Sequence, residues 1–121
     1  MQYMALIYGD GERWDALSAT EREAIYDRYR AFAKEAGDAG VMVGGNELGP
    51  TRDATTVRVR GDETLVTDGP YAEVKEALGG YFLFECDSMD DAVDYAARIP
   101  GAEHGAIEVR PVYVDPAEVQ L

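Results

Sequence analysis

The N-terminal segment Gln2 to Tyr8 reads as a strand that is apolar on both of its faces. Successive side chains of a strand point to opposite faces of its sheet, and here both sets are apolar: Tyr3, Ala5 and Ile7 on one face, and Met4, Leu6 and Tyr8 on the other. A strand of this kind needs cover on both sides. We therefore expect it at the centre of a sheet that is packed on both faces.

Two segments carry helix start signals followed by an apolar stripe. Ser18 and Glu21 form a capping box, in which each side chain can bond the other residue's backbone amide, and the helix that follows is expected to end at Gly37 to Gly40. The run from Ser88 to Asp91 repeats the pattern with Asp in place of Glu. A second helix is therefore predicted over residues 89–99, where Pro100 stops it.

Alternating apolar residues and turn signals predict further strands, over residues 41–48, 55–60, 64–67, 81–86 and 106–114. The turn Gly61-Asp62-Glu63 makes the second and third of these a hairpin with one exposed face. The glycines at 44 and 45 indicate a bulge. Residues 73–78 have one or two turns of helical character, and Gly79-Gly80 is interpreted as the turn that ends it.

The element order, β-α-β twice with a hairpin between, predicts an α+β ferredoxin-like sandwich. The 121 residues and the 46% apolar content suit one domain that spans residues 1–121. Two helices cover only one face of such a sheet, and the other face also carries apolar side chains. Stacking a second copy sheet to sheet would bury that face, so we predict a homodimer.

The charge and the apolar pattern exclude several classes of function. A formal net charge of −13 repels phosphate backbones and anionic lipids, so direct binding of nucleic acid is not expected. No run of about 18 apolar residues and no signal peptide are evident, and we expect a cytoplasmic protein without a membrane partner. Cys86, the single cysteine, is interpreted as a buried structural thiol.

The segment from Thr67 to Tyr81 carries a recognisable motif, Asp-Gly-Pro-Tyr-Ala-Glu-Val-Lys-Glu followed by Ala-Leu-Gly-Gly. It resembles the hallmark DGPFAETKE of the DGPF branch of the YCII-related family. Tyr71 stands in place of Phe, and Val74 stands in place of Thr. The resemblance extends over residues 44–114 and implies a dimeric α+β barrel, together with an association with extracytoplasmic-function sigma factors. The histidine of the His and Asp pair ascribed to another YCII branch has no match at the N-terminal end of this chain.

Four residues of this motif are candidate catalytic or binding groups: Asp68, Tyr71, Glu73 and Lys75. The Asp68 carboxylate can cap the turn formed with Gly69 and Pro70, or it can act as an acid or base. The Lys75 amine can be a solvated charge or a catalytic amine. We favour the structural interpretation in both cases. The motif glycines and the proline are assigned to the backbone: Gly69, Pro70, Gly79 and Gly80.

Outside the motif, the sequence offers few chemical groups. Glu108 and Arg110 share one face of the last strand, and we expect an inter-subunit salt bridge with Arg58 or Arg60 rather than a substrate clamp. His104 has no second ligand at metal spacing, so neither a metal nor another cofactor is expected. Trp14 is either a lid on a pocket or a dimer contact, and we favour the dimer contact.

Three functions fit these observations. The first is a dimeric accessory protein that binds a small molecule or a protein partner near residues 68–75, with a link to a sigma factor. The second is a small acid-base enzyme, with Asp68 or Glu73 as the base, Tyr71 as hydrogen-bond donor and Lys75 as electrostatic partner. The third is a scaffold in which the motif serves only the fold. Whether the protein is an enzyme stays open at this point.

Overall fold

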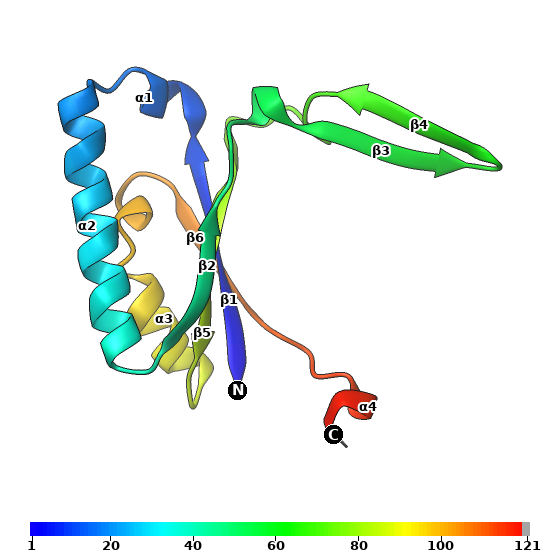
Figure 1. Cartoon of the computed structure of the whole chain (residues 1–121). Coiled ribbons are helices and arrows are strands. Elements are labelled where there is room, and N and C mark those ends of the chain that lie inside the picture. Colours follow the sequence, from blue (N-terminus) through cyan, green and yellow to red (C-terminus); the bar gives the residue numbers. More distant parts are fainter. Residues whose placement is uncertain (120–121) are drawn as a thin grey trace.

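The structure is a computed structural model that describes residues 1–119. Its elements along the chain are β1 (Gln2–Asp10), α1 (Gly11–Asp15), α2 (Ala19–Asp38), β2 (Met42–Glu47), the 3-10 helix η1 (Thr51–Asp53), β3 (Thr55–Arg60), β4 (Glu63–Asp68), β5 (Glu76–Glu85), α3 (Met89–Ala96), the 3-10 helix η2 (Pro100–Glu103), β6 (Ala106–Pro111) and α4 (Pro116–Val119) (Figure 1).

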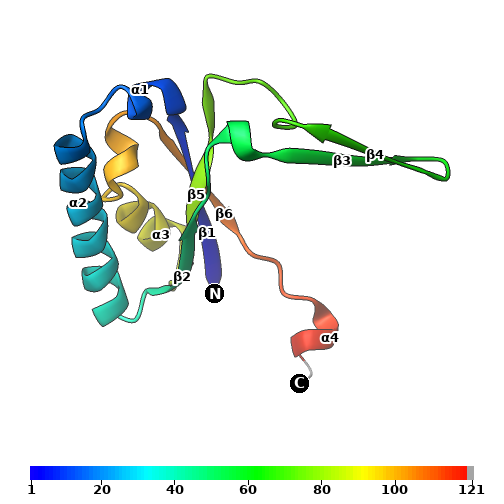
Figure 2. The same cartoon turned by 45° about the horizontal axis from the view of Figure 1, so that its top comes forward.

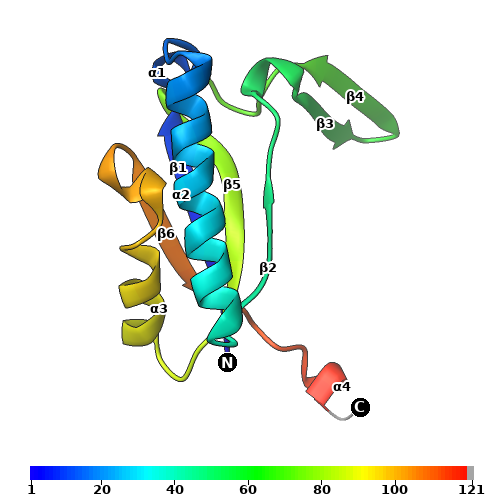
Figure 3. The ribbon, with the colours of Figure 1, turned by 60° about the vertical axis from the view of Figure 1, so that its left-hand side comes forward.

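The body of the molecule is a four-stranded sheet in the order β2-β5-β1-β6. Each neighbouring pair is antiparallel, and β1 lies in the interior of the sheet, as its apolar pattern predicts. Helices α2 and α3 lie on the same face of the sheet (Figures 1 and 3). The predicted α+β class is confirmed, and the arrangement is consistent with a ferredoxin-like fold. No helix in residues 1–119 is long and apolar enough to cross a membrane.

The core lies between this sheet and the two helices. The strands contribute Tyr3, Ala5 and Phe84, of which Ala5 and Phe84 are fully buried. The helical layer packs on them through Phe32, Ala36, Ala92, Ala96 and Ile99. Aromatic rings fill much of the space, with the Phe32 and Phe82 centroids 5.5 Å apart, a separation at which such rings interact favourably. The apolar stripes predicted for both helices therefore face the core.

The predicted capping box of α2 is present, and at α3 one half of the predicted pattern is found, since the Asp91 amide donates to the Ser88 hydroxyl at 3.2 Å. The Ser18 amide donates to the Glu21 carboxylate at 3.0 Å, and the Glu21 amide donates to the Ser18 hydroxyl at 3.1 Å. The bond from the Ser18 backbone amide, and after it the bond to the Ser18 side chain, hold the pKa of Glu21 below its usual value. Helix α3 ends at Ala96, earlier than predicted. The amides of Arg98 and Ile99 donate to the carbonyls three residues before them, those of Tyr95 and Ala96, instead of four residues before. These bonds tighten the last turn of the helix.

The prediction of a helical turn over residues 73–78 is wrong. Residues 73–75 are irregular with a bend at Lys75, and β5 begins at Glu76 and continues through Gly79 and Gly80. Ala77 and Leu78 favour helices, but both pair with β1, and this tertiary contact overrides local preference.

The interpretation of Gly79-Gly80 as a turn is likewise wrong. Ile7 pairs with Gly80 and Tyr8 with Leu78, so Gly79 is the extra residue of a β-bulge. A Cβ atom on Gly80 would lie 2.8 Å from the Asn46 carbonyl oxygen. The two glycines therefore allow a bulge and a close strand approach. The bulge predicted near Gly44 is confirmed by a register shift between Met42 and Gly44.

Strands β3 and β4 form a separate two-stranded sheet that leaves the body on the helix-free side (Figures 1 and 2). The predicted hairpin is confirmed, and its turn contains Gly61 at φ 60°, which glycine adopts without strain. Within one chain the hairpin has two exposed faces rather than the single exposed face that the sequence predicts. Val57, Val59 and Val66 share a face, because Val57 pairs with Val66, and each is about 60% exposed.

The face of the four-stranded sheet opposite α2 and α3 is the open face. It carries apolar side chains that are only half-buried: Met4, Leu6, Tyr8, Tyr81 and Leu83. Glu108 and Arg110 lie on the same face of β6 and are exposed. Strand β6 ends at Pro111, earlier than the predicted Val114, although the Val112 amide still donates to the Gln2 carbonyl.

Candidate functional site

The candidate loop, residues 69–75, connects the hairpin to β5. Its first residue, Gly69, has φ 107°, a value that side-chain-bearing residues rarely adopt. The Gly69 amide donates to the Ala54 carbonyl at 2.7 Å, and the Thr56 hydroxyl donates to the Gly69 carbonyl at 2.8 Å. These bonds fix the start of the loop to the base of β3. Gly69 thus has the backbone role that the sequence assigned to it.

The side chains of the four candidate residues point into solvent. Asp68, Glu73 and Lys75 are exposed, and Tyr71 is 80% exposed. Within residues 1–119, no hydrogen bond or ion pair joins any two of the four, and none caps the turn through the Asp68 carboxylate. Two surface hollows lie elsewhere, one along α2 and one of about 410 Å³ beside Val41, Cys86 and Tyr95. The loop of one chain therefore does not assemble a concave reaction site.

Tyr71 nevertheless has a defined neighbour. The Arg58 guanidinium lies 5.3 Å from the centroid of the Tyr71 ring, within the range of a cation–π contact. Arg58 belongs to β3 and Tyr71 to the loop, so this contact holds the aromatic ring against the hairpin while its other surface stays open. An exposed tyrosine beside an arginine is typical of protein recognition surfaces.

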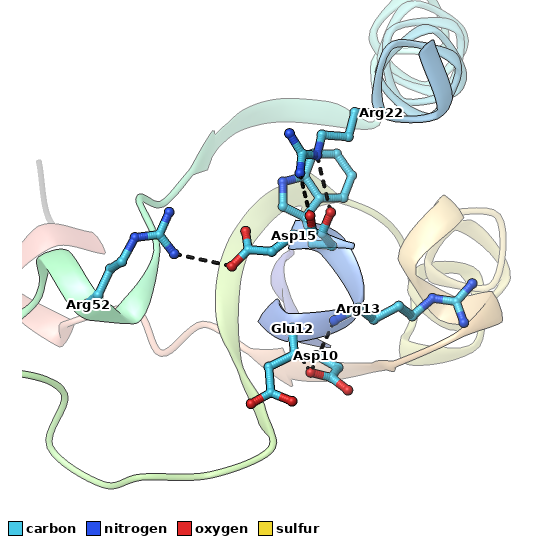
Figure 4. Close-up of polar contacts among 7 residues, drawn as sticks. Asp10, Glu12, Arg13, Asp15, Arg22 and Arg52 are labelled. Carbon is cyan, nitrogen blue, oxygen red and sulfur yellow. Dashed lines mark hydrogen bonds and ion pairs between the residues drawn. The ribbon is translucent and has the colours of Figure 1, made fainter. Parts of the chain in front are cut away.

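A second polar cluster surrounds α1 (Figure 4). The Asp10 carboxylate accepts from the amides of Glu12 and Arg13 at 3.0 and 3.5 Å and begins this helix. Arg22 donates to the Trp14 carbonyl at 3.1 Å and to the Asp15 carbonyl at 2.8 Å. The sequence pattern does not predict this helix, because a five-residue helix has no apolar stripe.

Trp14 has contacts inside the chain. Its ring meets Tyr26 edge to face at 5.4 Å, and Arg22 lies 5.9 Å from its centroid. Arg52 of η1 pairs with the Asp15 carboxylate at 3.3 Å, which ties the base of the hairpin to α1 (Figure 4). Such an exposed pair adds little stability by itself. Packing against α2 accounts for Trp14, and its predicted role in a dimer stays a prediction.

Two tyrosines at the same end of the sheet donate to side chains of β2. The Tyr26 hydroxyl donates to the Glu47 carboxylate at 2.8 Å, and this bond raises the pKa of Tyr26. The Tyr81 hydroxyl donates to Asn46 Oδ1, also at 2.8 Å. The Tyr26 phenol therefore keeps its proton at neutral pH. Both hydroxyls serve to fix the edge strand β2 against α2 and β5.

The remaining sequence candidates are separated from the loop. Glu108 accepts a long bond of 3.5 Å from the Tyr8 hydroxyl, and Arg58 and Arg60 lie in the other sheet. The predicted inter-subunit salt bridge stays a prediction. Cys86 is buried, as predicted, and desolvation raises the pKa of its thiol. His104 is exposed at the end of η2.

The fold and the loop define the class: a small α+β protein with an antiparallel sheet, one open sheet face and a projecting hairpin. The family model of the YCII-related domain matches residues 1–114, and the chain belongs to this family. It is 38% identical over 114 residues to the uncharacterized protein R00369 of Rhizobium meliloti (strain 1021), a match that covers 93% of this chain and 92% of that protein. The assignment to the DGPF branch stays a prediction.

Proposed function

We propose that the protein is a homodimeric binding protein of the cytoplasm, which recognises another protein through the loop from Asp68 to Lys75. The observation that carries this proposal is the exposed ring of Tyr71 beside Arg58. Tyrosine and arginine dominate the binding energy of many protein interfaces because they present large, rigid surfaces. The surrounding charges of Glu73 and Lys75 would form the polar rim of such a contact.

Protein recognition fits the loop better than recognition of a small molecule. Small-molecule sites are concave and bury most of the ligand, whereas the loop is convex and exposed, and Val74 adds an open apolar side chain, 59% exposed. The family resemblance suggests a partner of defined chemistry, an extracytoplasmic-function sigma factor. Its binding would make the protein an accessory to transcription without any contact to DNA by this acidic chain.

The enzyme and scaffold hypotheses make different demands. An acid-base enzyme would need Asp68, Tyr71, Glu73 or Lys75 to converge in a partly dry site, and a second chain or the bound partner would have to supply the missing wall. A scaffold needs none of the exposed side chains. The binding hypothesis gives a role to the exposed surface of the Tyr71 ring, which the scaffold hypothesis does not.

Homodimerisation is proposed from the open sheet face. Its apolar side chains, such as Leu6 and Leu83, are only half-buried in one chain, and two sheets stack at about 10 Å with their side chains interdigitated. Glu108 and Arg110 lie on the same face and would then contribute the inter-subunit ion pairs that the sequence suggests. Sedimentation of Leu83→Arg tests the stacking, because a charge there should leave a monomer. Val93→Arg on exposed α3 is the matched control.

The test of recognition is calorimetric titration of the wild-type protein with the extracytoplasmic-function sigma factor of the same genome. Tyr71→Ala should weaken binding by about 30-fold, the effect of a hot-spot residue. Tyr113→Ala removes a tyrosine that is 94% exposed outside the loop and should leave the affinity unchanged. Equal affinities for wild type and Tyr71→Ala, or no binding at all, would sink the proposal.

A thermal-shift screen with metabolites and divalent metals separates the alternatives. A metabolite that stabilises the wild type but neither Asp68→Asn nor Lys75→Met, with equal melting temperatures without ligand, would support a small-molecule site. A turnover assay on that metabolite would then decide between a receptor and an enzyme. Variants that melt well below the wild type without any ligand would instead support the scaffold hypothesis.

A further inference from the structure

The hairpin β3–β4 has an apolar face that no other part of the described chain covers. Val57, Val59 and Val66 share this face and are 59%, 61% and 63% exposed. Every residue of β4 is exposed, and the hairpin pairs with no strand of the four-stranded sheet. An isolated two-stranded hairpin is only marginally stable in water. Its valine face is therefore expected to pack on another surface.

The valine face is directed toward the side of the open sheet. Arg58 and Tyr71 are in contact, so the arginine face of β3 lies toward the loop, and strand alternation turns Val57 and Val59 the other way. Figure 2 shows the loop passing over one side of the hairpin base, while the opposite side is toward the C-terminal segment. The hairpin itself projects from the helix-free side of the sheet (Figure 1). Two apolar faces thus border the same space.

The open sheet face and the hairpin face together offer one partner a larger contact area than the sheet face alone. With the strand lengths of this sheet and the usual spacings between strands and residues, its projected area is about 500 Å². A standard stable interface buries about 800 Å² on each partner. One face of the hairpin adds about 200 Å². The hairpin face therefore adds about two fifths to the projected area that sheet stacking alone offers.

We propose that the β3–β4 hairpin is an arm that extends onto a second copy of this chain, with its valine face packed on the four-stranded body of that copy. This inference rests on the proposed homodimer and extends it, because the sheet stack then carries two symmetric arms. The arm also places loop 69–75 at the junction of the two copies, since Gly69 is bonded to the hairpin base through Ala54 and Thr56.

The test is the dissociation constant of self-association, measured by sedimentation equilibrium. The triple variant Val57→Thr, Val59→Thr and Val66→Thr keeps the shape and strand preference of each side chain but adds a polar hydroxyl. We expect the dissociation constant to rise by at least about tenfold, with an unchanged circular dichroism spectrum. Val93→Thr, on the helix side of the body, should leave the constant as in the wild type.

A change in the opposite direction guards against misfolding of the hairpin. Val57→Ile with Val66→Ile enlarges the apolar face without a loss of strand preference, and it should tighten self-association. In addition, the amides of β3 and β4 should exchange more slowly in the wild-type dimer than in the monomeric Leu83→Arg variant.

The outcomes separate the arm from the dimer itself. If Leu83→Arg gives a monomer while both hairpin variants keep the wild-type dissociation constant, the sheet-to-sheet dimer is supported and the proposed arm is refuted. The valine face would then contact another protein or solvent. If the wild type is a monomer at all concentrations, the homodimer fails and the arm fails with it. An arm on the second copy requires that the threonine and isoleucine variants shift the constant in opposite directions.

Discussion

The two sheets of this protein have similar strands but different cover. In β5, Phe84 is fully buried, whereas Val66 of β4 is 63% exposed. Both strands carry adjacent apolar residues, Tyr81 to Phe84 in β5 and Leu65 and Val66 in β4, so the local pattern does not by itself account for the difference. The body has α2 and α3 directly beside its sheet (Figure 3), while the hairpin has no helix of its own. Burial in this chain is decided by which elements the connections bring onto a strand.

The largest expected difference between the two regions is in their response to loss of apolar side chains. Phe84→Ala removes a ring that contacts Phe32, Phe82 and Tyr95, and it should lower the free energy of unfolding by about 3–5 kcal/mol. Val66→Ala, in a dilute and monomeric sample, should lower it by less than about 0.5 kcal/mol. Urea denaturation followed by fluorescence measures both. Equal effects would show that the hairpin is as well packed as the body.

A second prediction concerns the two glycines of β5. Gly80→Ala would place a Cβ atom 2.8 Å from the Asn46 carbonyl oxygen, so β2 must shift, at a cost of about 1–3 kcal/mol. Gly79→Ala is the matched control, because its Cβ would meet nothing closer than 3.9 Å. Thermal unfolding should place Gly80→Ala clearly below both the wild type and Gly79→Ala. Similar melting temperatures for the two variants would refute a close approach of β2 and β5 here.

Much of the body could be predicted from the sequence, because local signals and burial agree there. The central position of β1 follows from its two apolar faces, and the start of α2 follows from the capping box of Ser18 and Glu21. Residues 76–78 show the opposite case: their helix preference is local, but the pairing with β1 is between distant segments. No local pattern reports such pairing.

The candidate site was harder to predict than the fold. The loop motif identified Asp68, Tyr71 and Lys75, but their exposure depends on where the hairpin leaves the body, which is set by tertiary packing. The Arg22 bonds to the backbone around α1 were missed because charged residues on a helix surface rarely carry a positional signal. The Arg58 and Tyr71 contact was also missed, although both residues were noted for other reasons.

The smallest predicted effect tests the helix cap of the body and its dependence on pH. Ser18→Ala removes the hydroxyl that accepts from the Glu21 amide, at a cost of about 1 kcal/mol at neutral pH. The pKa of Glu21 is lowered in the folded state by Ser18, so the carboxylate's contribution is present above its unfolded value of 4.5 and is lost as the pH falls through the folded value. The alanine variant keeps the backbone amide and loses only the side-chain part of this lowering, so the melting-temperature difference between wild type and Ser18→Ala should shrink from pH 7 to pH 3 by that part alone.

Glu21→Gln is the control for this prediction, because glutamine can still accept from the Ser18 amide but does not titrate. In that background, Ser18→Ala should lower the melting temperature by the same amount at both pH values. The hairpin contributes no part of this pH dependence, since the capped helix lies in the body. A pH-independent effect of Ser18→Ala in the wild-type background would mean that the Ser18 hydroxyl does not interact with the Glu21 carboxylate, whose bond to the backbone amide of residue 18 remains in the variant.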